Sequence, residues 1–542
     1  MHIGKALATL TFAAIPLAAA AQPASTPPIA PLLDGIGPLH FPISTVEPRA
    51  QRYFNQALTL AFGFNHAEAV RSFRAAAALD PTCGICYAGQ ALALGPNINM
   101  PMSEDAIAPA WKAVESALAQ RHHETDPERD YIDAIAARYS EDGKDRQALD
   151  AAFSEAMAAL AAKYPDDLHA RTLYAESLMD RLPWAYWNDD GTPKEMTPTL
   201  VEALERVLAA DPQHPGAAHL YIHAMEQFTP KKAEAAADRL GDLVPVAGHL
   251  VHMPSHIYLR LGRYHDAVIA NERAAAADED YIAQCNAQGL YPAAYYPHNL
   301  HFLWYAAMME GRRGLALATA ARLRERVPVQ VAREMGAIQA YLPVRIFTFA
   351  RFGMWDEALA EPPEAEGLPY ATAMWHYGRG LAFAARGDVD SAHGELAALQ
   401  AAQDSDKFDL VVLRRRAEIS RKLVDISANL VRAGIEKHLG NTGREVELLR
   451  EAVDIQLKLP YSEPPFWHFP VRQALGTALL RQGDAEAARA VFEADLAEFP
   501  ENGWSLHGLR AALAGSGRST GGVERRLEAA WQYSDIEPGT AW

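Results

Sequence analysis

One pattern constrains the fold of this chain more than any other: an alanine-rich segment of helical character recurs along it, usually closed by a proline. Four clear copies span residues 65–81, 145–165, 263–278 and 483–500. The segments that precede the copies carry apolar residues at helical spacing and end in glycine turns, as at Gly262 and Gly483. Strand signals are nearly absent. The sequence therefore predicts an all-α fold built from paired helices.

A single helix pair of this kind cannot bury its apolar face, so neighbouring pairs stack into a superhelical solenoid with a concave inner surface. We expect roughly ten to twelve pairs, arranged as N-terminal repeats at 47–210, central repeats at 211–330, and C-terminal repeats with a cap at 331–542. The spacing of Gly262, Tyr264 and Ala267, with Phe492 and Pro500, resembles the tetratricopeptide repeat (TPR). That resemblance implies a TPR-like helical solenoid.

The N-terminus has the composition of a targeting segment. Lys5 precedes an apolar stretch that ends in four alanines, which is typical of a secretory signal peptide at 1–21 cut after Ala21. Residues 22–46 then form a tether or extended segment, rich in proline at its start. We therefore expect an exported protein, periplasmic or secreted.

Three cysteines bear on that compartment. Export would expose Cys83, Cys86 and Cys285 to oxidising conditions, and the CxxC pair at 83 and 86 is close enough to form a local disulfide. Two small apolar side chains on one helix face explain the pair equally well. A zinc knuckle would need a second such pair, which the sequence lacks.

Charge and hydropathy exclude several kinds of partner. The chain has 50 Lys and Arg against 68 Asp and Glu, a formal net charge of −18. Such an acidic protein is a poor binder of nucleic acid. Beyond the N-terminus no apolar run approaches the length of about 20 residues that a membrane-spanning helix needs. We expect no membrane span after signal cleavage.

The histidines are concentrated in the centre of the chain. Nine of the 20 histidines lie between His214 and His301. His219 and His223 are one helical turn apart on one face, Glu226 continues that face, and the four-residue spacing recurs in the next repeat. Two imidazoles on one helix face are a common arrangement for holding a metal ion.

Aligning the repeats on their turns brings three of these histidines into register. Gly262 lies ten residues after His252, Gly311 ten after His301, and Thr229 ten after His219. Equivalent positions of neighbouring first helices are adjacent in a solenoid, so these rings should approach one another. The sequence predicts a metal site drawn from His219, His223, His252, His256 and His301, with Glu226, His249 and His298 in or around its ligand shell.

Proline positions support neutral rings in this set. Pro215, Pro254 and Pro297 each stand where a helix would begin. The positive end of the helix dipole disfavours imidazolium and so favours the form that ligates metal.

Several functions are compatible with such a cluster. Imidazole with a carboxylate suits Cu, Zn or Fe, and an open coordination position would serve a metal-dependent oxidoreductase or hydrolase acting on a small molecule. The histidines could instead form a buried hydrogen-bond network with tyrosines, or line a pocket for an anionic or peptide ligand. The alternative from another class is a periplasmic interaction scaffold that binds a peptide or a partner protein in the groove. No catalytic residue can be assigned from the sequence.

Four segments also resemble a group of exported bacterial TPR proteins with histidine-rich central repeats. They lie at 83–99, 217–227, 248–264 and 297–312. The resemblance covers nearly the whole mature chain. It implies a fold and a compartment, and no activity.

Overall fold

The computed structural model describes residues 29–285, 291–411, 413 and 416–536. Over these residues the chain folds into helices, and the only β pairing among them is two isolated bridges. The first third comprises α1 (Pro48–Phe62), α2 (His66–Leu79), α3 (Gly84–Leu94), α4 (Glu104–Gln120), α5 (Asp126–Ala136), α6 (Arg146–Lys163), α7 (Leu168–Arg181) and α8 (Thr197–Ala210).

The central helices carry the histidine-rich segments. They are α9 (Pro215–Met225), α10 (Pro230–Leu243), α11 (Gly248–His252), α12 (Pro254–Leu261), α13 (Tyr264–Cys285), α14 (Tyr296–Glu310) and α15 (Arg313–Arg326). A single π-helical turn, Tyr291–Tyr295, leads into α14.

The remaining helices form the other end of the molecule. They are α16 (Val329–Glu334), α17 (Val344–Phe352), α18 (Trp355–Ala360), α19 (Pro369–Arg386), α20 (Val389–Gln403), α21 (Ala417–His438), α22 (Thr442–Gln456), α23 (Arg472–Gln482), α24 (Ala485–Glu498), α25 (Gly503–Gly515) and α26 (Gly521–Ala530).

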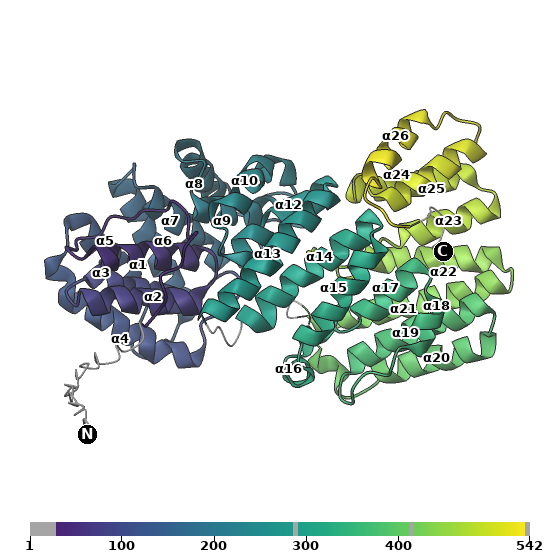
Figure 1. The fold of residues 1–542 in the computed structure, drawn as a ribbon, viewed down its shortest axis with the longest axis horizontal. Coiled ribbons are helices and arrows are strands. Elements are labelled where there is room, and N and C mark those ends of the chain that lie inside the picture. The colour runs from purple at the N-terminus through teal and green to yellow at the C-terminus, as the bar shows by residue number, and fades with distance from the viewer. Residues whose placement is uncertain (1–28, 286–290, 412, 414–415, 537–542) are drawn as a thin grey trace, which may run out of the picture.

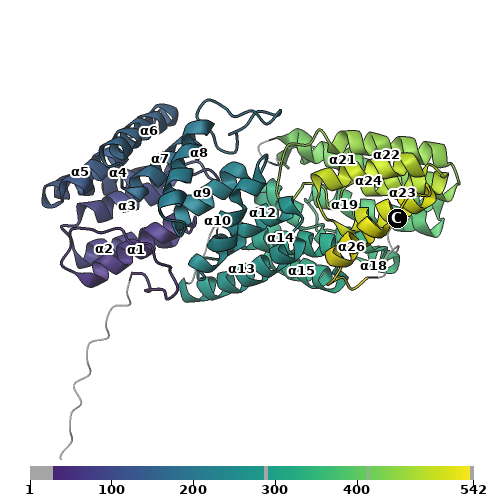
Figure 2. The same cartoon turned by 90° about the horizontal axis from the view of Figure 1, so that it is seen from above.

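Successive helices pack as antiparallel pairs, and each pair packs on the next. α1 contacts α2, α9 contacts α10, α14 contacts α15, and α19 contacts α20. The result is an elongated stack with α1 to α8 in one half, α9 to α14 in its middle, and α17 to α26 in the other half (Figures 1 and 2). The predicted all-α, TPR-like helical solenoid is confirmed.

Glycines make the tight turns between paired helices. Gly262 ends α12 with φ 76° and Gly311 ends α14 with φ 74°. This left-handed conformation costs a glycine little because it has no Cβ. The turn positions used to align the repeats are therefore real helix ends, and His252 and His301 lie at equivalent distances before them.

The segment before α1 lies against the first repeat. The Tyr53 hydroxyl donates to the Ala30 carbonyl (2.9 Å), and the Gln56 amide donates to the Pro31 carbonyl (2.9 Å). Residues 29–46 of the predicted tether therefore pack on α1 without forming a helix. The predicted signal peptide at 1–21 lies outside the described residues.

The CxxC pair is bonded. Cys83 and Cys86 form a disulfide at the start of α3, and both are buried. The sequence left two interpretations of this pair open, and the structure contains the disulfide. Cys285 is a buried free thiol whose pKa burial raises to about 12.

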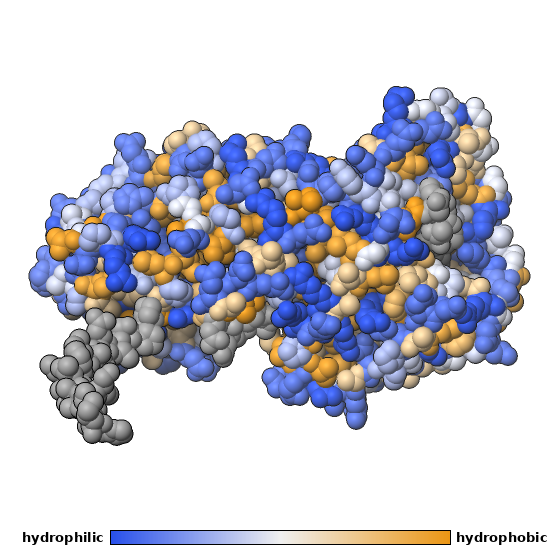
Figure 3. All heavy atoms as spheres, in the orientation of Figure 1, coloured by the Kyte–Doolittle hydropathy of each residue, from blue (hydrophilic) through white to orange (hydrophobic). Residues whose placement is uncertain are grey.

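None of the described helices combines the length and the apolar character needed to cross a bilayer. The face seen in Figure 3 mixes hydrophilic and hydrophobic residues along the whole solenoid.

Candidate metal centre

Three neighbouring repeats bring their first helices together in the middle of the solenoid. α9 contacts α12, and α11 contacts α14. Pro215 and Pro254 are the first residues of α9 and α12, and Pro297 lies in the first turn of α14, as predicted. The histidine-rich segments therefore meet at one place, to which each contributes imidazole rings.

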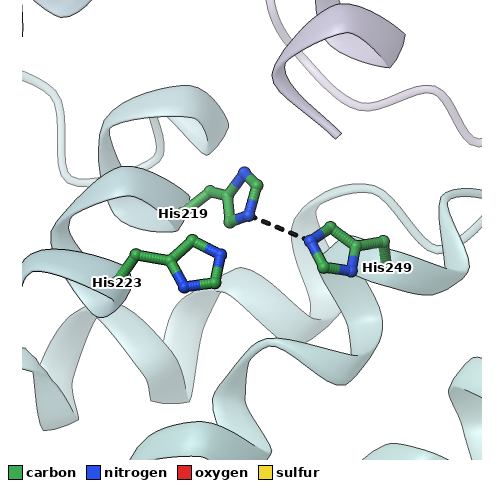
Figure 4. A group of neighbouring side chains, drawn as sticks. All are labelled: His219, His223 and His249. Atoms are coloured by element: carbon green, nitrogen blue, oxygen red, sulfur yellow. Dashed lines mark hydrogen bonds between the residues drawn. The ribbon is translucent and has the colours of Figure 1, made fainter. Parts of the chain in front are cut away.

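The first group of rings consists of His219, His223 and His249. One ligand atom from each lies within 4.8 Å of the others, and all three residues are buried. His219 and His223 extend from α9 and His249 reaches toward them from α11, so that the three rings point at one another (Figure 4). The closest approach is 3.1 Å, between the Nε2 atoms of His219 and His249.

The second group consists of His252, His256 and His298, under the same limit of 4.8 Å between ligand atoms. His252 ends α11, His256 lies in α12, and His298 lies in the first turn of α14. Here the Nε2 atoms of His252 and His256 are 2.9 Å apart.

Glu226 lies between the two groups. Its carboxylate is 2.5 Å from His256 Nδ1 and 3.6 Å from His223 Nδ1, and its side chain is 2% exposed. Glu226 therefore approaches one ring of each group, His256 and His223. In each case it approaches Nδ1, the nitrogen that does not face the other rings of that group.

Hydrogen-bond partners assign the protons on three of the rings. His219 Nδ1 lies 2.6 Å from the Phe62 carbonyl, which only accepts, so this nitrogen carries the proton. His252 Nδ1 lies 2.7 Å from Asn271 Oδ1, and the Asn271 amide nitrogen donates to the Ala267 carbonyl, which fixes the amide orientation.

The same reasoning applies to His256. Its contact with Glu226 departs from ideal hydrogen-bond geometry, but at 2.5 Å a ring nitrogen and a carboxylate oxygen require a proton between them. A neutral ring that is protonated on Nδ1 presents a lone pair on Nε2. The Nε2 atoms of His219, His252 and His256 are therefore lone-pair donors.

This assignment makes the contact between His252 and His256 unusual. Two lone pairs repel one another at 2.9 Å unless a positive charge lies between them. That charge is either an additional proton on one ring or a metal ion coordinated by both. Metal-bound histidines characteristically donate their second nitrogen to a carbonyl or carboxylate, which is the pattern at His219, His252 and His256.

Burial keeps most of the cluster neutral. It lowers the pKa of His219, His249, His252 and His298 well below the ordinary value, and the neighbouring histidines lower it further. The helix dipole was the predicted cause of neutral rings, whereas desolvation is the largest cause in the structure. For Glu226, burial acts to raise the pKa, but His256 and His223 hold it well below the usual range.

His301 lies apart from both groups. Its ring stacks on Trp304 with 5.3 Å between centroids and 9° between planes, and it meets Tyr341 edge to face. The alignment of repeats placed His301 at the cluster, but His298 takes that place. The two residues are three positions apart, so their side chains diverge by about 60° around the helix axis, and only one of them faces the other rings.

A cavity of about 220 Å³ adjoins both groups. Its wall includes His223 and His249 from the first group and His256 and His298 from the second. Glu226, Glu463, Trp184, Tyr295 and Tyr341 also line it. A small molecule in this cavity would contact the cluster directly.

Three functional features were missed by the sequence analysis. Asn271 comes from a second helix, α13, and looks like any polar residue in a repeat. The Phe62 carbonyl belongs to α1, which lies beside α9 in the superhelix although 157 residues separate Phe62 from His219. Glu463 lies 3.8 Å from His256 Nδ1, and its position in the proline-rich stretch before His468 was its only signal.

No protein-family model matches the sequence, and no curated protein does. Among solved structures, yeast Tom70 is similar over 89% of this chain and 91% of its own, with 11% identity and a TM-score of 0.28. A human IFIT1 dimer with m7Gppp-AAAA is similar over 84% and 90%, with 9% identity and a TM-score of 0.32. Naa15/Naa10 bound to HypK-THB is similar over 89% and 70%, with 12% identity and a TM-score of 0.21. At this level of identity, nothing of those proteins' binding or activity is carried over to this chain.

Proposed function

We propose that this protein binds transition-metal ions through the histidine cluster of its central repeats. The observation that carries the proposal is the pair of Nε2 lone pairs of His252 and His256, 2.9 Å apart. Burial lowers the pKa of His252 and so disfavours an extra proton on that ring, and a coordinated metal ion would supply the positive charge between the two lone pairs. Neutral imidazole is also the commonest side-chain metal ligand.

The surroundings of the rings support the same proposal. Asn271, the Phe62 carbonyl and Glu226 each orient one ring through Nδ1, which holds Nε2 in place and raises its basicity. The His249 ring contacts His219 Nε2 through its own Nε2, whereas its buried Nδ1 has no hydrogen-bond partner among the described residues. A purely structural histidine network would pair such an atom.

The cavity beside the cluster suggests what the metal does. Copper, zinc or iron bound by these rings would face a space in which a small molecule fits. We propose that the protein is a metal-dependent oxidoreductase or hydrolase acting on a small molecule there, in the periplasm or outside the cell after export. The metal would supply Lewis acidity or redox capacity, while the rings fix its position.

Elemental analysis tests the proposal. Full-length protein purified without an affinity tag should contain copper, zinc or iron, and His252→Ala should contain less of it because the facing pair is broken. The matched control is His214→Asn, which alters a buried histidine that caps α9 but retains an acceptor at the cap. Wild-type protein that stays metal-free after incubation with each of the three ions would leave the proton as the charge between the rings and refute the proposal.

A second candidate is an interaction scaffold that binds a peptide or partner protein along the solenoid. The elongated stack of helix pairs supports it, because such stacks present extended concave surfaces. A folded but metal-free His252→Ala variant that binds a co-purifying native partner as tightly as the wild type does would favour the scaffold.

A further inference from the structure

The six rings divide into two sets of three. Each set supplies one ligand atom per residue within 4.8 Å of the other two, and the two sets share no residue. Each set also draws on two repeats: the first on α9 and α11, the second on α11, α12 and α14. We infer that the cluster is a two-ion centre, with one metal ion per set, an inference that rests on the proposed metal-binding function.

One ion cannot be served by all six rings. A histidine nitrogen bonds zinc at about 2.0–2.1 Å, so two ligands of one ion lie at most about 4.2 Å apart. The sets are arranged side by side and not around one point. Ring centroids of His219 and His223 are 4.8 Å apart, and those of His252 and His298 are 4.9 Å apart. Ring centroids of His223 and His249, within the first set, are 6.2 Å apart, whereas those of His223 and His256, between the sets, are 5.4 Å apart. The two sets therefore adjoin closely and are distinguished by their ligand atoms.

Glu226 links the two sets, and with His223 and His256 it forms a third group whose ligand atoms lie within 4.8 Å of one another. Its carboxylate contacts Nδ1 of His256 in the second set and approaches Nδ1 of His223 in the first, at 2.5 and 3.6 Å. Since it contacts the side of each ring away from Nε2, one buried acid orients a ligand of each ion. This shared acid ties the geometry of the two ions together.

The charge of the site indicates which ions it accepts. Six neutral imidazoles contribute no charge, and the buried carboxylates nearby are Glu226 and Glu463, which lie 2.5 and 3.8 Å from His256 Nδ1. The Arg260 guanidinium lies 3.8 Å from Glu463, so these three groups together carry a net charge of −1. Two divalent ions would leave a larger excess of positive charge in this buried site than two monovalent ions would, and such an excess is costly. Copper in its cuprous state is the monovalent transition-metal ion that imidazoles bind, so the geometry and charge point to a pair of cuprous ions.

The cavity wall contains rings from both sets, His223 and His249 on one side and His256 and His298 on the other. A ligand of a few atoms in that space would contact both ions at once. The two-ion centre is therefore suited to a small molecule that bridges the ions, as in other paired-metal sites.

Copper stoichiometry tests the inference. Metal-free, full-length protein is loaded with excess cuprous ion under anaerobic conditions and desalted, and copper per chain is measured by mass spectrometry. We expect two copper ions in the wild type, one in His219→Ala, one in His298→Ala, and none in the double variant. His301→Ala changes the same helix as His298 but no member of either set, and it should keep two. Loading with zinc in parallel should give fewer than two ions per chain.

The outcomes separate the two proposals. One copper per chain in the wild type, lost in either single variant, would overturn the two-ion centre and leave metal binding intact. Two coppers that persist in either variant would also overturn it. No bound metal of any kind would overturn the proposed function itself. Two zinc ions bound as tightly as copper would refute the preference for monovalent ions. Far-ultraviolet circular dichroism checks the fold of each variant, and His219→Asn and His298→Asn replace any alanine variant that fails to fold.

Discussion

His252 and His256 show how much a single turn of helix can constrain chemistry. They are four residues apart, and their Nε2 atoms approach to 2.9 Å while each Nδ1 is directed to a different acceptor, Asn271 or Glu226. The spacing follows from the local backbone, because Met253 between α11 and α12 also has helical angles (φ −51°, ψ −36°). The direction of the lone pairs follows from Asn271 in the second helix of the same repeat and from Glu226 in the preceding repeat. At the scale of the residue, the acceptors decide what the rings can bind.

His301 allows a test of the electrostatics next to the cluster. Burial lowers its pKa from 6.5 to about 4, so the folded chain keeps the ring neutral while the unfolded chain takes up a proton below pH 6.5. The stability that depends on this neutral ring is present above pH 6.5 and is lost as the pH falls toward 4. At about 1.4 kcal/mol per pH unit, the loss is at most about 3 kcal/mol.

We therefore expect His301→Phe, which keeps a flat ring on Trp304, to lose less stability on acidification than the wild type. Urea denaturation of both metal-free proteins between pH 7 and pH 4 measures the difference. Because every other titrating group is shared, the two curves should diverge below pH 6.5. Parallel curves over that range would show that His301 is not a buried neutral ring.

At the scale of the element, α11 is the helix that joins the two sets of rings. It spans Gly248–His252 and carries His249 of the first set and His252 of the second. A helix this short has little stability of its own, so packing must hold it. It packs on α13, where Gly248 lies against Asp278. A Cβ at position 248 would lie 1.9 Å from Asp278 Oδ1 and 2.9 Å from the Ala274 carbonyl oxygen.

Gly248→Ala should therefore destabilise the protein by about 1–3 kcal/mol, as overpacking does elsewhere, and should reduce metal at both sets because α11 must shift. Gly394→Ala in α20 is the matched control, since a Cβ there meets nothing within 4 Å. Alanine is the better helix former, so the control should be neutral or stabilising by up to about 1 kcal/mol. Urea denaturation and metal analysis of both variants check this. If Gly248→Ala and Gly394→Ala were equally stable, the close approach of Asp278 to Gly248 would be contradicted.

At the scale of the whole molecule, the superhelix brings distant parts of the chain together. The Trp504 indole in α25 donates to the Met308 carbonyl in α14 (2.9 Å). The Asp535 carboxylate accepts from the backbone N–H groups of Arg313 (2.6 Å) and Gly314 (2.8 Å). The C-terminal segment thus caps α15 across more than 200 residues of sequence, which fixes the last repeats against the central ones.

Asp535→Ala should lower the free energy of unfolding by about 1 kcal/mol, the usual value of a helix N-cap. Asp535→Asn keeps an acceptor and should lose less. Metal content should be unchanged in both, because Asp535 contacts α15 and no ring of the cluster. Thermal denaturation with elemental analysis measures both quantities, and a loss of metal in Asp535→Ala would show that the C-terminal contact supports the site.

The sequence by itself determined the helices, their pairing and the turns, because spacing of apolar residues, prolines and glycines is local information. It also identified the histidine-rich repeats and the pairs His219 with His223 and His252 with His256, since residues four apart share a helix face. Only the tertiary structure decided that His298, and not His301, faces the other rings, and that the six rings form two sets. Those outcomes depend on the rotation of each helix about its axis and on acceptors from other helices, such as the Phe62 carbonyl and Asn271. Packing across the superhelix sets both, and no local pattern encodes them.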